Sequence, residues 1–168
     1  MAKGAGDNRV STWRKAGTPL TEDLYFSGGK RQEYVDLDET HKSKIKEVKR
    51  RIQKEMYQKL RDVETPQVID DGKVISIHYS NAGIKHFCND AMIRLSGKYF
   101  SETSMMNIDK IIAKSTYVPS SHSLYKARTD GREMWFKYKD ADGRGIYFKV
   151  SWNSSNKYYE LYSVTDVL

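Results

Sequence analysis

Three side chains in the last third of the chain have the types needed to handle a phosphate group. His122, Lys126 and Arg128 lie in the stretch SSHSLYKARTDGREMWFKYKDADGRG. Histidine has an ordinary pKa of about 6.5, so it can transfer a proton in either direction near neutral pH. Lysine and arginine stabilise negative charge on phosphate oxygens, and arginine does so through a planar fork of donors. If a strand begins at Ser123, Lys126 and Arg128 point to the same side of it.

The same two cations also fit an ordinary protein surface. Lysine and arginine that alternate along an edge strand protect a sheet against pairing with another chain. Lys126 and Arg128 therefore predict either a phosphate site or a protected sheet edge, and the sequence leaves both interpretations open.

Two of the four histidines are the stronger candidates for proton transfer. His86 lies one position off the apolar stripe of a predicted helix, where a helix can present a side chain to a cleft. His122 lies in a Ser-rich loop, and loops held by a rigid scaffold often carry chemistry. His41 and His78 are weaker candidates. For each histidine the alternative is a surface or half-buried side chain without a catalytic role.

The sequence predicts neither a metal site nor a cofactor. Its single cysteine, Cys88, excludes an internal disulfide, and Cys and His nowhere recur at zinc-ligand spacing. Cys88 falls on an apolar helical stripe, so we interpret it as a small buried hydrophobe and not as a reactive thiol. Histidines and cations without a cluster of carboxylates favour metal-independent chemistry over metal-assisted hydrolysis.

The positive charge of the chain is concentrated in one segment. The net charge is +7, and residues 41–61 alone hold nine basic and two acidic side chains, which equals the whole excess. We predict an amphipathic helix over residues 39–64 because apolar residues recur there every three or four positions. Those residues are Ile45, Val48, Ile52, Met56, Leu60 and Val63.

This basic helix has more than one interpretation. It could simply dock on a core with its cations in water. It could also contact nucleic-acid phosphates, and the side chains predicted to do so are Lys46, Arg50, Lys54 and Arg61. A membrane surface or a partner helix is a further alternative. Composition alone does not separate these.

The remaining segments predict one domain with an extension. Residues 1–38 have the composition of an extended arm or linker, although Trp13 and Tyr34 are too apolar for a purely solvated one. The chain has neither an apolar run of about 18 residues, as a membrane span requires, nor the apolar core of a signal peptide. The length of 168 residues fits about one domain.

Residues 67–168 are predicted to form this α+β domain. A strand in KVISIHYS precedes a helix that Ser80 or Asn81 caps, and a second helix extends from Ser104 to Lys114. TYVPSSH is expected to be a loop. The segments EMWFKYKD, GIYFKVSWN and YYELYSVTDV alternate as strands do. We therefore expect helices packed on one face of a C-terminal antiparallel sheet of about four strands, preceded by the basic helix and the extended arm.

The two faces of these strands differ in character. Met134, Phe136, Tyr138, Ile146, Phe148, Val150 and Trp152 are predicted to face the core, and the opposite face carries Trp135, Lys137, Lys139, Tyr147, Lys149 and Ser151. Lys137 and Lys149 among aromatic rings would suit RNA, through phosphate contacts and base stacking. The alternative is that this face is simply exposed to solvent, because helices cover only the other face of the sheet.

The order of these elements carries a family resemblance over about residues 70–168. Its motifs are AGIKHFCNDAMIRL, SSHSLYKARTDGREMWFKYKD, ADGRGIYFKV and YYELYSVTDV. In this order they resemble the barnase/EndoU/colicin/RelE-like nuclease superfamily, in particular the compact nuclease-like domains at the ends of phage and mobile-element head-morphogenesis or polyvalent proteins. The resemblance implies metal-free RNA cleavage, with His86 and His122 as base and acid, Lys126 and Arg128 on the phosphate, and a hydroxyl at Thr165 in the final strand.

Two functional hypotheses are consistent with these features. The first is a metal-independent ribonuclease, a toxin-like effector domain of a phage or mobile element that acts on RNA in a bacterial cytoplasm and pairs with an immunity protein. The second is a non-catalytic, virion-associated or nucleic-acid-binding module of the same fold, with a virion protein as partner. A plain protein-interaction module is a third alternative.

Overall fold

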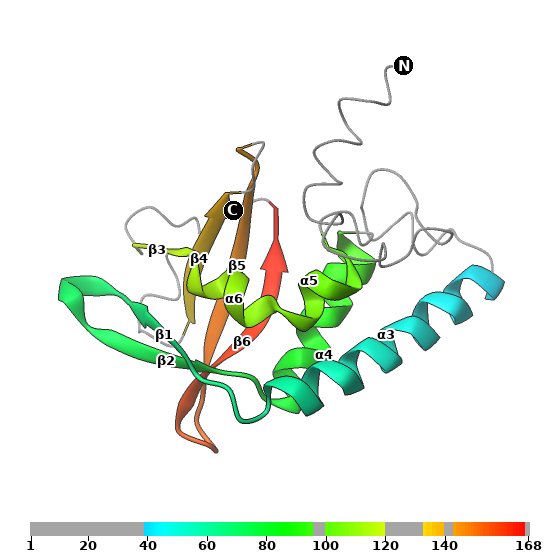
Figure 1. Cartoon of the computed structure of the whole chain (residues 1–168), viewed down its shortest axis with the longest axis horizontal. Helices are drawn as coiled ribbons and strands as arrows, with labels where there is room; N and C mark the ends of the chain where they lie inside the picture. Colours follow the sequence, from blue (N-terminus) through cyan, green and yellow to red (C-terminus); the bar gives the residue numbers. More distant parts are fainter. Residues whose placement is uncertain (1–38, 96–99, 120–132, 140–142, 167–168) are drawn as a thin grey trace.

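The computed structural model describes residues 39–95, 100–119, 133–139 and 143–166 (Figure 1). The predicted α+β class is confirmed. Along the chain the elements are α3 (Glu39–Leu60), β1 (Thr65–Val68), a 3₁₀ turn (Asp70–Gly72), β2 (Val74–His78), α4 (Asn81–Asn89), a π turn (Asp90–Arg94), α5 (Glu102–Met106), α6 (Ile108–Ala113), β3 (Thr116–Val118), β4 (Glu133–Lys139), β5 (Gly145–Asn153) and β6 (Tyr158–Thr165).

The sheet has six strands in the order β1-β2-β6-β5-β4-β3 and curls into a nearly closed, barrel-like form. All neighbouring strands are antiparallel except β2 and β6, which run parallel. The prediction of about four antiparallel strands was therefore wrong in strand number and, at β2 and β6, in direction. Pro66 lies in the edge strand β1, where a proline is tolerated because its missing N–H is not needed. Thr116–Val118, expected to be loop, pairs with β4 as β3.

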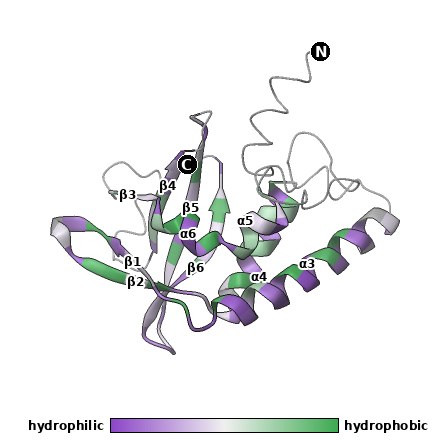
Figure 2. Ribbon diagram, viewed as in Figure 1, coloured by the Kyte–Doolittle hydropathy of each residue, from purple (hydrophilic) through white to green (hydrophobic). Residues whose placement is uncertain are grey.

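The helices and the sheet share one hydrophobic core. The fully buried side chains include Ile52, Met56, Leu60, Phe87, Phe100, Phe136, Phe148 and Val150. The basic helix α3 thus contributes to the same core as the strands, and Figure 2 shows its hydrophobic residues interrupted by strongly hydrophilic ones along its length. Of the strand residues predicted to face the core, Met134, Phe136, Ile146, Phe148 and Val150 are buried, whereas Tyr138 is only partly buried.

Two tryptophans differ from the prediction in their exposure to solvent. Trp135, expected on the wet face, is only 7% exposed, because its cross-strand neighbours Val118 and Lys149 flank it. Trp152, expected in the core, is 39% exposed and packs edge-to-face on Tyr159. It lies near the end of β5, beyond the part of that strand that the core residues Phe148 and Val150 occupy.

The local predictions for the helices were largely right. Ser80 caps α4 by accepting a hydrogen bond from the Gly83 N–H at 3.0 Å. Cys88 is fully buried, and burial raises the pKa of its thiol to about 12, as expected of an inert side chain. The predicted helix from Ser104 to Lys114 is instead two short helices, α5 and α6, which meet at Asn107.

Helix α4 lies directly against the backbone of β6. β2 pairs with β6 only at Tyr159 and Glu160, and α4 contacts the next part of β6. A Cβ atom at Gly83 would lie 2.3 Å from the Leu161 carbonyl oxygen, so only glycine permits this approach. The Ser80 hydroxyl, one turn earlier, donates to the Glu160 carboxylate.

We expect Gly83→Ala to destabilise the protein by about 1–3 kcal/mol, because the added methyl group must push α4 away from β6. Alanine normally stabilises a helix relative to glycine by about 0.5–1 kcal/mol. The sign of the change in unfolding free energy, measured by chemical denaturation, therefore tests the contact. Ala82→Gly, at the neighbouring exposed position, is the control and should cost only the propensity difference. A stabilised Gly83→Ala protein would contradict the close approach.

Candidate functional site

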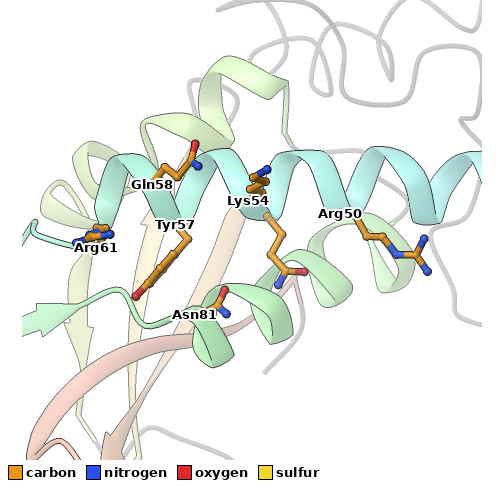
Figure 3. Close-up of a pocket in the computed structure, with 7 residues that line it drawn as sticks. Arg50, Lys54, Tyr57, Gln58, Arg61 and Asn81 are labelled. Carbon is orange, nitrogen blue, oxygen red and sulfur yellow. The ribbon is translucent and has the colours of Figure 1, made fainter.

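A polar stripe runs along α3 beside its apolar stripe. Its positions recur every three or four residues, so they lie on one side of the helix. In chain order they are Lys46, Lys49, Arg50, Gln53, Lys54, Tyr57, Gln58 and Arg61. Figure 3 shows several of these side chains extending from α3 toward and beside α4. Helix α3 therefore carries core residues on one side and cations on the adjacent side.

This stripe forms one wall of a groove, and α4 forms the other. Two adjoining hollows of about 400 and 420 Å³ lie between the helices and share Arg50 and Gln53. We call them together the α3–α4 groove, which the eight stripe residues line together with Asn81 and Lys85 of α4. Asn81 lies at the Arg61 end of the groove, whereas Lys85 lies with Lys46.

The lining of the groove is cationic and contains no carboxylate. Six of its ten residues are lysine or arginine, three are amides and one is tyrosine. Within the described ranges, Arg61 is the groove cation that forms an ion pair, at 3.6 Å from Asp62, whose side chain is 90% exposed. An ion pair this exposed is worth little, so the groove carries nearly its full positive charge.

The carboxylates near α3 lie on its other side. Arg51 forms two hydrogen bonds with Glu102 of α5, of 2.5 and 3.2 Å, and lies 3.5 Å from Glu55. Lys59 likewise donates to Asn107, at the junction of α5 and α6. The cations of α3 that face α5 are therefore paired with acceptors, whereas among those that face α4 only Arg61 has a carboxylate partner in the described part of the chain.

Lys49 lies close to other positive charges in the groove. Its Nζ donates to Asn89 Oδ1 at 3.4 Å, and its side chain is partly buried. Burial lowers the pKa of Lys49, and the positive charges of Lys85, Arg50 and Lys46 lower it further. A bound anion would relieve this repulsion, because an opposite charge favours the protonated amine.

His86 lies on a different side of α4, against β6. Its Nδ1 is 3.0 Å from the Tyr162 carbonyl oxygen and 3.3 Å from Asp90 Oδ2, and its ring stacks on Tyr162 with centroids 4.0 Å apart. Both neighbours are acceptors, so Nδ1 carries the proton when the ring is neutral. This leaves Nε2 as the acceptor, on a side chain that is 42% exposed.

A bulge in β6 supplies the carbonyl group that holds His86. Lys149 pairs with Ser163 and Val150 pairs with Leu161, so Tyr162 is an extra residue in β6. The extra residue of a bulge is left out of the regular ladder, which frees its carbonyl oxygen for a side-chain donor. The bulge thus gives His86 a fixed acceptor.

Asp90 holds His86 from the buried side. Its side chain is only 5% exposed, accepts a hydrogen bond from the Ser163 hydroxyl and lies 3.9 Å from Arg94. A carboxylate behind Nδ1 orients the ring. His86, Asp90 and Ser163 therefore form a hydrogen-bonded cluster, and the His86 side chain is the one that solvent can reach.

The structure brings four of the other predicted site residues together, and three lie outside the described ranges. Lys46, Arg50, Lys54 and Arg61 meet in the α3–α4 groove. Thr165 lies two residues after Ser163 in β6. His122, Lys126 and Arg128 fall outside the described residues, so their convergence with His86 stays a prediction.

The sheet lysines do not join the groove. Lys137 lies over the ring of Tyr147 and Lys149 over that of Tyr162, at 5.5 and 5.2 Å from the ring centroids. Lys149 is also 3.8 Å from Glu133, which offsets part of its charge. This cationic and aromatic side of the sheet is partly buried, so it is a weaker candidate for phosphate contacts than the groove.

Sequence reasoning missed several residues of these two sites, among them Lys49, Tyr57 and Lys85 of the groove. Lys49 comes three positions after Lys46 on the same stripe, a spacing that could have revealed it. Asp90 comes four positions after His86, which also places two side chains together on a helix. Lys85 and the extra residue in β6 had no such local signal, because the packing of α4 on α3 and β6 brings them into place.

Two further findings concern metal ligands and membrane spans among the described residues. In the described part of the chain, no group of three or more His, Cys, Asp and Glu side chains is placed to hold a metal ion. None of the described helices combines the length and the apolar character that crossing a membrane requires.

We expect neutral His86 to carry its proton on Nδ1, because both neighbours of that nitrogen are acceptors. His78 provides an internal control, since its Nε2 lies 3.3 Å from Glu64 Oε1 and should carry the proton instead. Two-bond nitrogen–proton correlation spectra of the neutral rings distinguish these tautomers. A proton on Nε2 of His86 would contradict the arrangement with Tyr162 and Asp90.

Comparisons with protein-family models, with curated proteins and with solved structures found no match to this chain. The resemblance to the barnase/EndoU/colicin/RelE-like nuclease superfamily therefore stays a prediction from the order of motifs. The function must be inferred from the α3–α4 groove and from the surroundings of His86.

Proposed function

We propose that this protein binds nucleic acid, with RNA as the expected ligand, through phosphate contacts in the α3–α4 groove. The observation that carries the proposal is the gathering of six cations around a lining without a carboxylate. Phosphate contacts by lysine and arginine supply most of the sequence-independent affinity for nucleic acid.

The dimensions of the groove suit a chain of phosphates better than a single ion. Lys46 and Arg61 are fifteen residues apart on one helix, which corresponds to about 22 Å. Cations at regular intervals over this length can contact several consecutive phosphates. Lys49, already depressed in pKa by burial and by its cationic neighbours, gains most from such contacts.

An anionic membrane is a poorer ligand for this helix. A helix that lies on a membrane inserts its apolar side into the lipid. The apolar residues of α3, Ile45, Ile52, Met56 and Leu60, are at most 1% exposed and pack within the protein. The side of α3 toward α4 is exposed and cationic, and this favours a ligand recognised by charge.

Neutralising Lys46, Arg50, Lys54 and Arg61 together, each to Gln, should weaken binding to all RNA sequences alike. The slope of log affinity against log salt should flatten by about three, because each lost phosphate contact on a single strand accounts for about 0.7 of it. Fluorescence anisotropy at several salt concentrations measures both quantities.

A charge-matched variant controls for net charge. It carries Gln at four exposed lysines away from the groove, Lys73, Lys110, Lys114 and Lys139. This control should retain most of the affinity and the salt slope. Equal losses in the two variants would show that charge alone, and not the groove, accounts for binding. Binding of wild-type protein to anionic vesicles but not to RNA would replace nucleic acid by a membrane surface.

A second candidate function is metal-independent RNA cleavage, and the orientation of His86 favours it. A general base needs a free acceptor nitrogen and a group that holds the ring in place. His86 has the first in Nε2 and the second in Asp90 and the Tyr162 carbonyl. The resemblance to the nuclease superfamily points the same way, with His122 as the predicted second proton-transfer group.

His86→Ala should lower single-turnover cleavage of a mixed RNA pool, in the presence of a chelator, by about a hundredfold or more if His86 is the base. Asp90→Asn should lower it less, because the Tyr162 carbonyl still holds the ring. His78→Ala is the control and should leave the rate unchanged. Wild-type protein that binds RNA without cleaving it would leave binding as the function.

A further inference from the structure

One end of the α3–α4 groove differs chemically from the rest. From Lys46 to Arg50 the lining is almost wholly cationic, as phosphate contacts alone require. Toward the other end the lining contains Tyr57, Gln58 and Asn81 beside Arg61. Phosphate binding needs neither an aromatic ring nor carboxamides, so these side chains indicate a second kind of contact.

Tyr57 is placed to offer its ring to a ligand. Its side chain is half-buried, packs against the core at its base and lines the hollow of about 400 Å³. Figure 3 shows it extending from α3 between Arg61 and Asn81. Within the described ranges its hydroxyl has no hydrogen-bond partner, unlike Tyr79, which pairs with Thr65. The packing fixes the ring without occupying the hollow.

The carboxamides next to this ring can read a base edge. A carboxamide carries both a donor and an acceptor, so it can form paired hydrogen bonds with a nucleobase. Gln58 and Asn81 approach the hollow from two different helices. A flat base on Tyr57 would have the Asn81 carboxamide on one side and the Arg61 guanidinium on the other.

We propose that this end of the groove is a nucleotide subsite, in which an unstacked base of a single-stranded nucleic acid lies on the ring of Tyr57 between Arg61 and Asn81. The inference rests on the proposed function, because the cationic end of the groove supplies the phosphate contacts that bring the strand there.

The subsite predicts a preference for single strands over duplexes. The bases of a duplex are stacked on each other and paired, so their faces are not available to a protein ring. An unpaired strand can turn one base into the hollow while its phosphates track the cations of α3. The hollow has the size of a small ligand site, which is sufficient for one base.

The test compares single-stranded and duplex oligonucleotides of about 12 nucleotides and one sequence, bound to the full chain. Tyr57→Leu keeps an apolar side chain on the core but removes the aromatic face. It should weaken binding of the single strand about 5- to 150-fold, the range found when one stacking residue is lost. Duplex affinity should stay within about twofold. Tyr57→Phe keeps the ring and should bind the single strand as the wild type does.

A fluorescent base gives an independent measurement. 2-Aminopurine loses fluorescence when it stacks on an aromatic ring, so a single strand that contains it should be quenched by wild-type protein and by Tyr57→Phe. Tyr57→Leu should bind it with little quenching. Thermal unfolding of each variant shows whether weaker binding comes from the missing aromatic ring or from an unfolded protein.

The outcomes distinguish the two proposals. Wild-type binding of single strand and duplex with equal affinity, together with unchanged binding by Tyr57→Leu, would overturn the subsite and leave the phosphate groove intact. Quenching that persists in Tyr57→Leu would also overturn it. Wild-type protein that binds neither oligonucleotide would overturn the proposed function itself, and with it the subsite.

Discussion

Helix α4 lies against the backbone of β6 because residue 83 has no side chain, and both candidate sites depend on this contact. With Gly83 on the Leu161 carbonyl, the next turns of α4 run along β6, so His86 reaches Tyr162 and Asp90 reaches Ser163. The same placement turns Lys85 toward α3, where it completes the groove. A helix one side-chain diameter farther from the strand would hold neither His86 nor the second wall.

The cations on the α4 side of α3 repel one another, and this repulsion lowers the stability of the protein without a ligand. Arg51 is paired with Glu102, while the groove cations other than Arg61 face one another without a carboxylate partner among the described residues. Like charges held close together destabilise a fold, and a protein retains such an arrangement where a ligand supplies the missing charge. The hydrophobic core offsets the repulsion, because α3 is anchored by residues such as Ile52 and Leu60 that are wholly removed from water.

Local periodicity in the sequence predicted the longer elements, whereas features that depend on long-range packing were missed. The apolar repeats located α3, α4 and the three longest strands, and the spacing of the cations on α3 indicated four of the residues that line the groove. β3 was missed because three residues are too few to show alternation, and β1 because Pro66 indicates an end of structure. The groove wall from Lys85 and the bulge at Tyr162 depend on how distant segments meet, and no short window of residues contains that information.

The parallel pairing of β2 with β6 joins residues 74–78 to residues 158–165 and has a consequence for biosynthesis. The ribosome completes α3 and α4 long before it adds β6, the strand that positions α4. Contacts between such distant segments form late and slowly. Until β6 emerges, the cations of α3 have no fixed second wall, so the growing chain carries a basic segment without the shaped groove. The groove between α3 and α4 therefore takes its final shape only when β6 is in place.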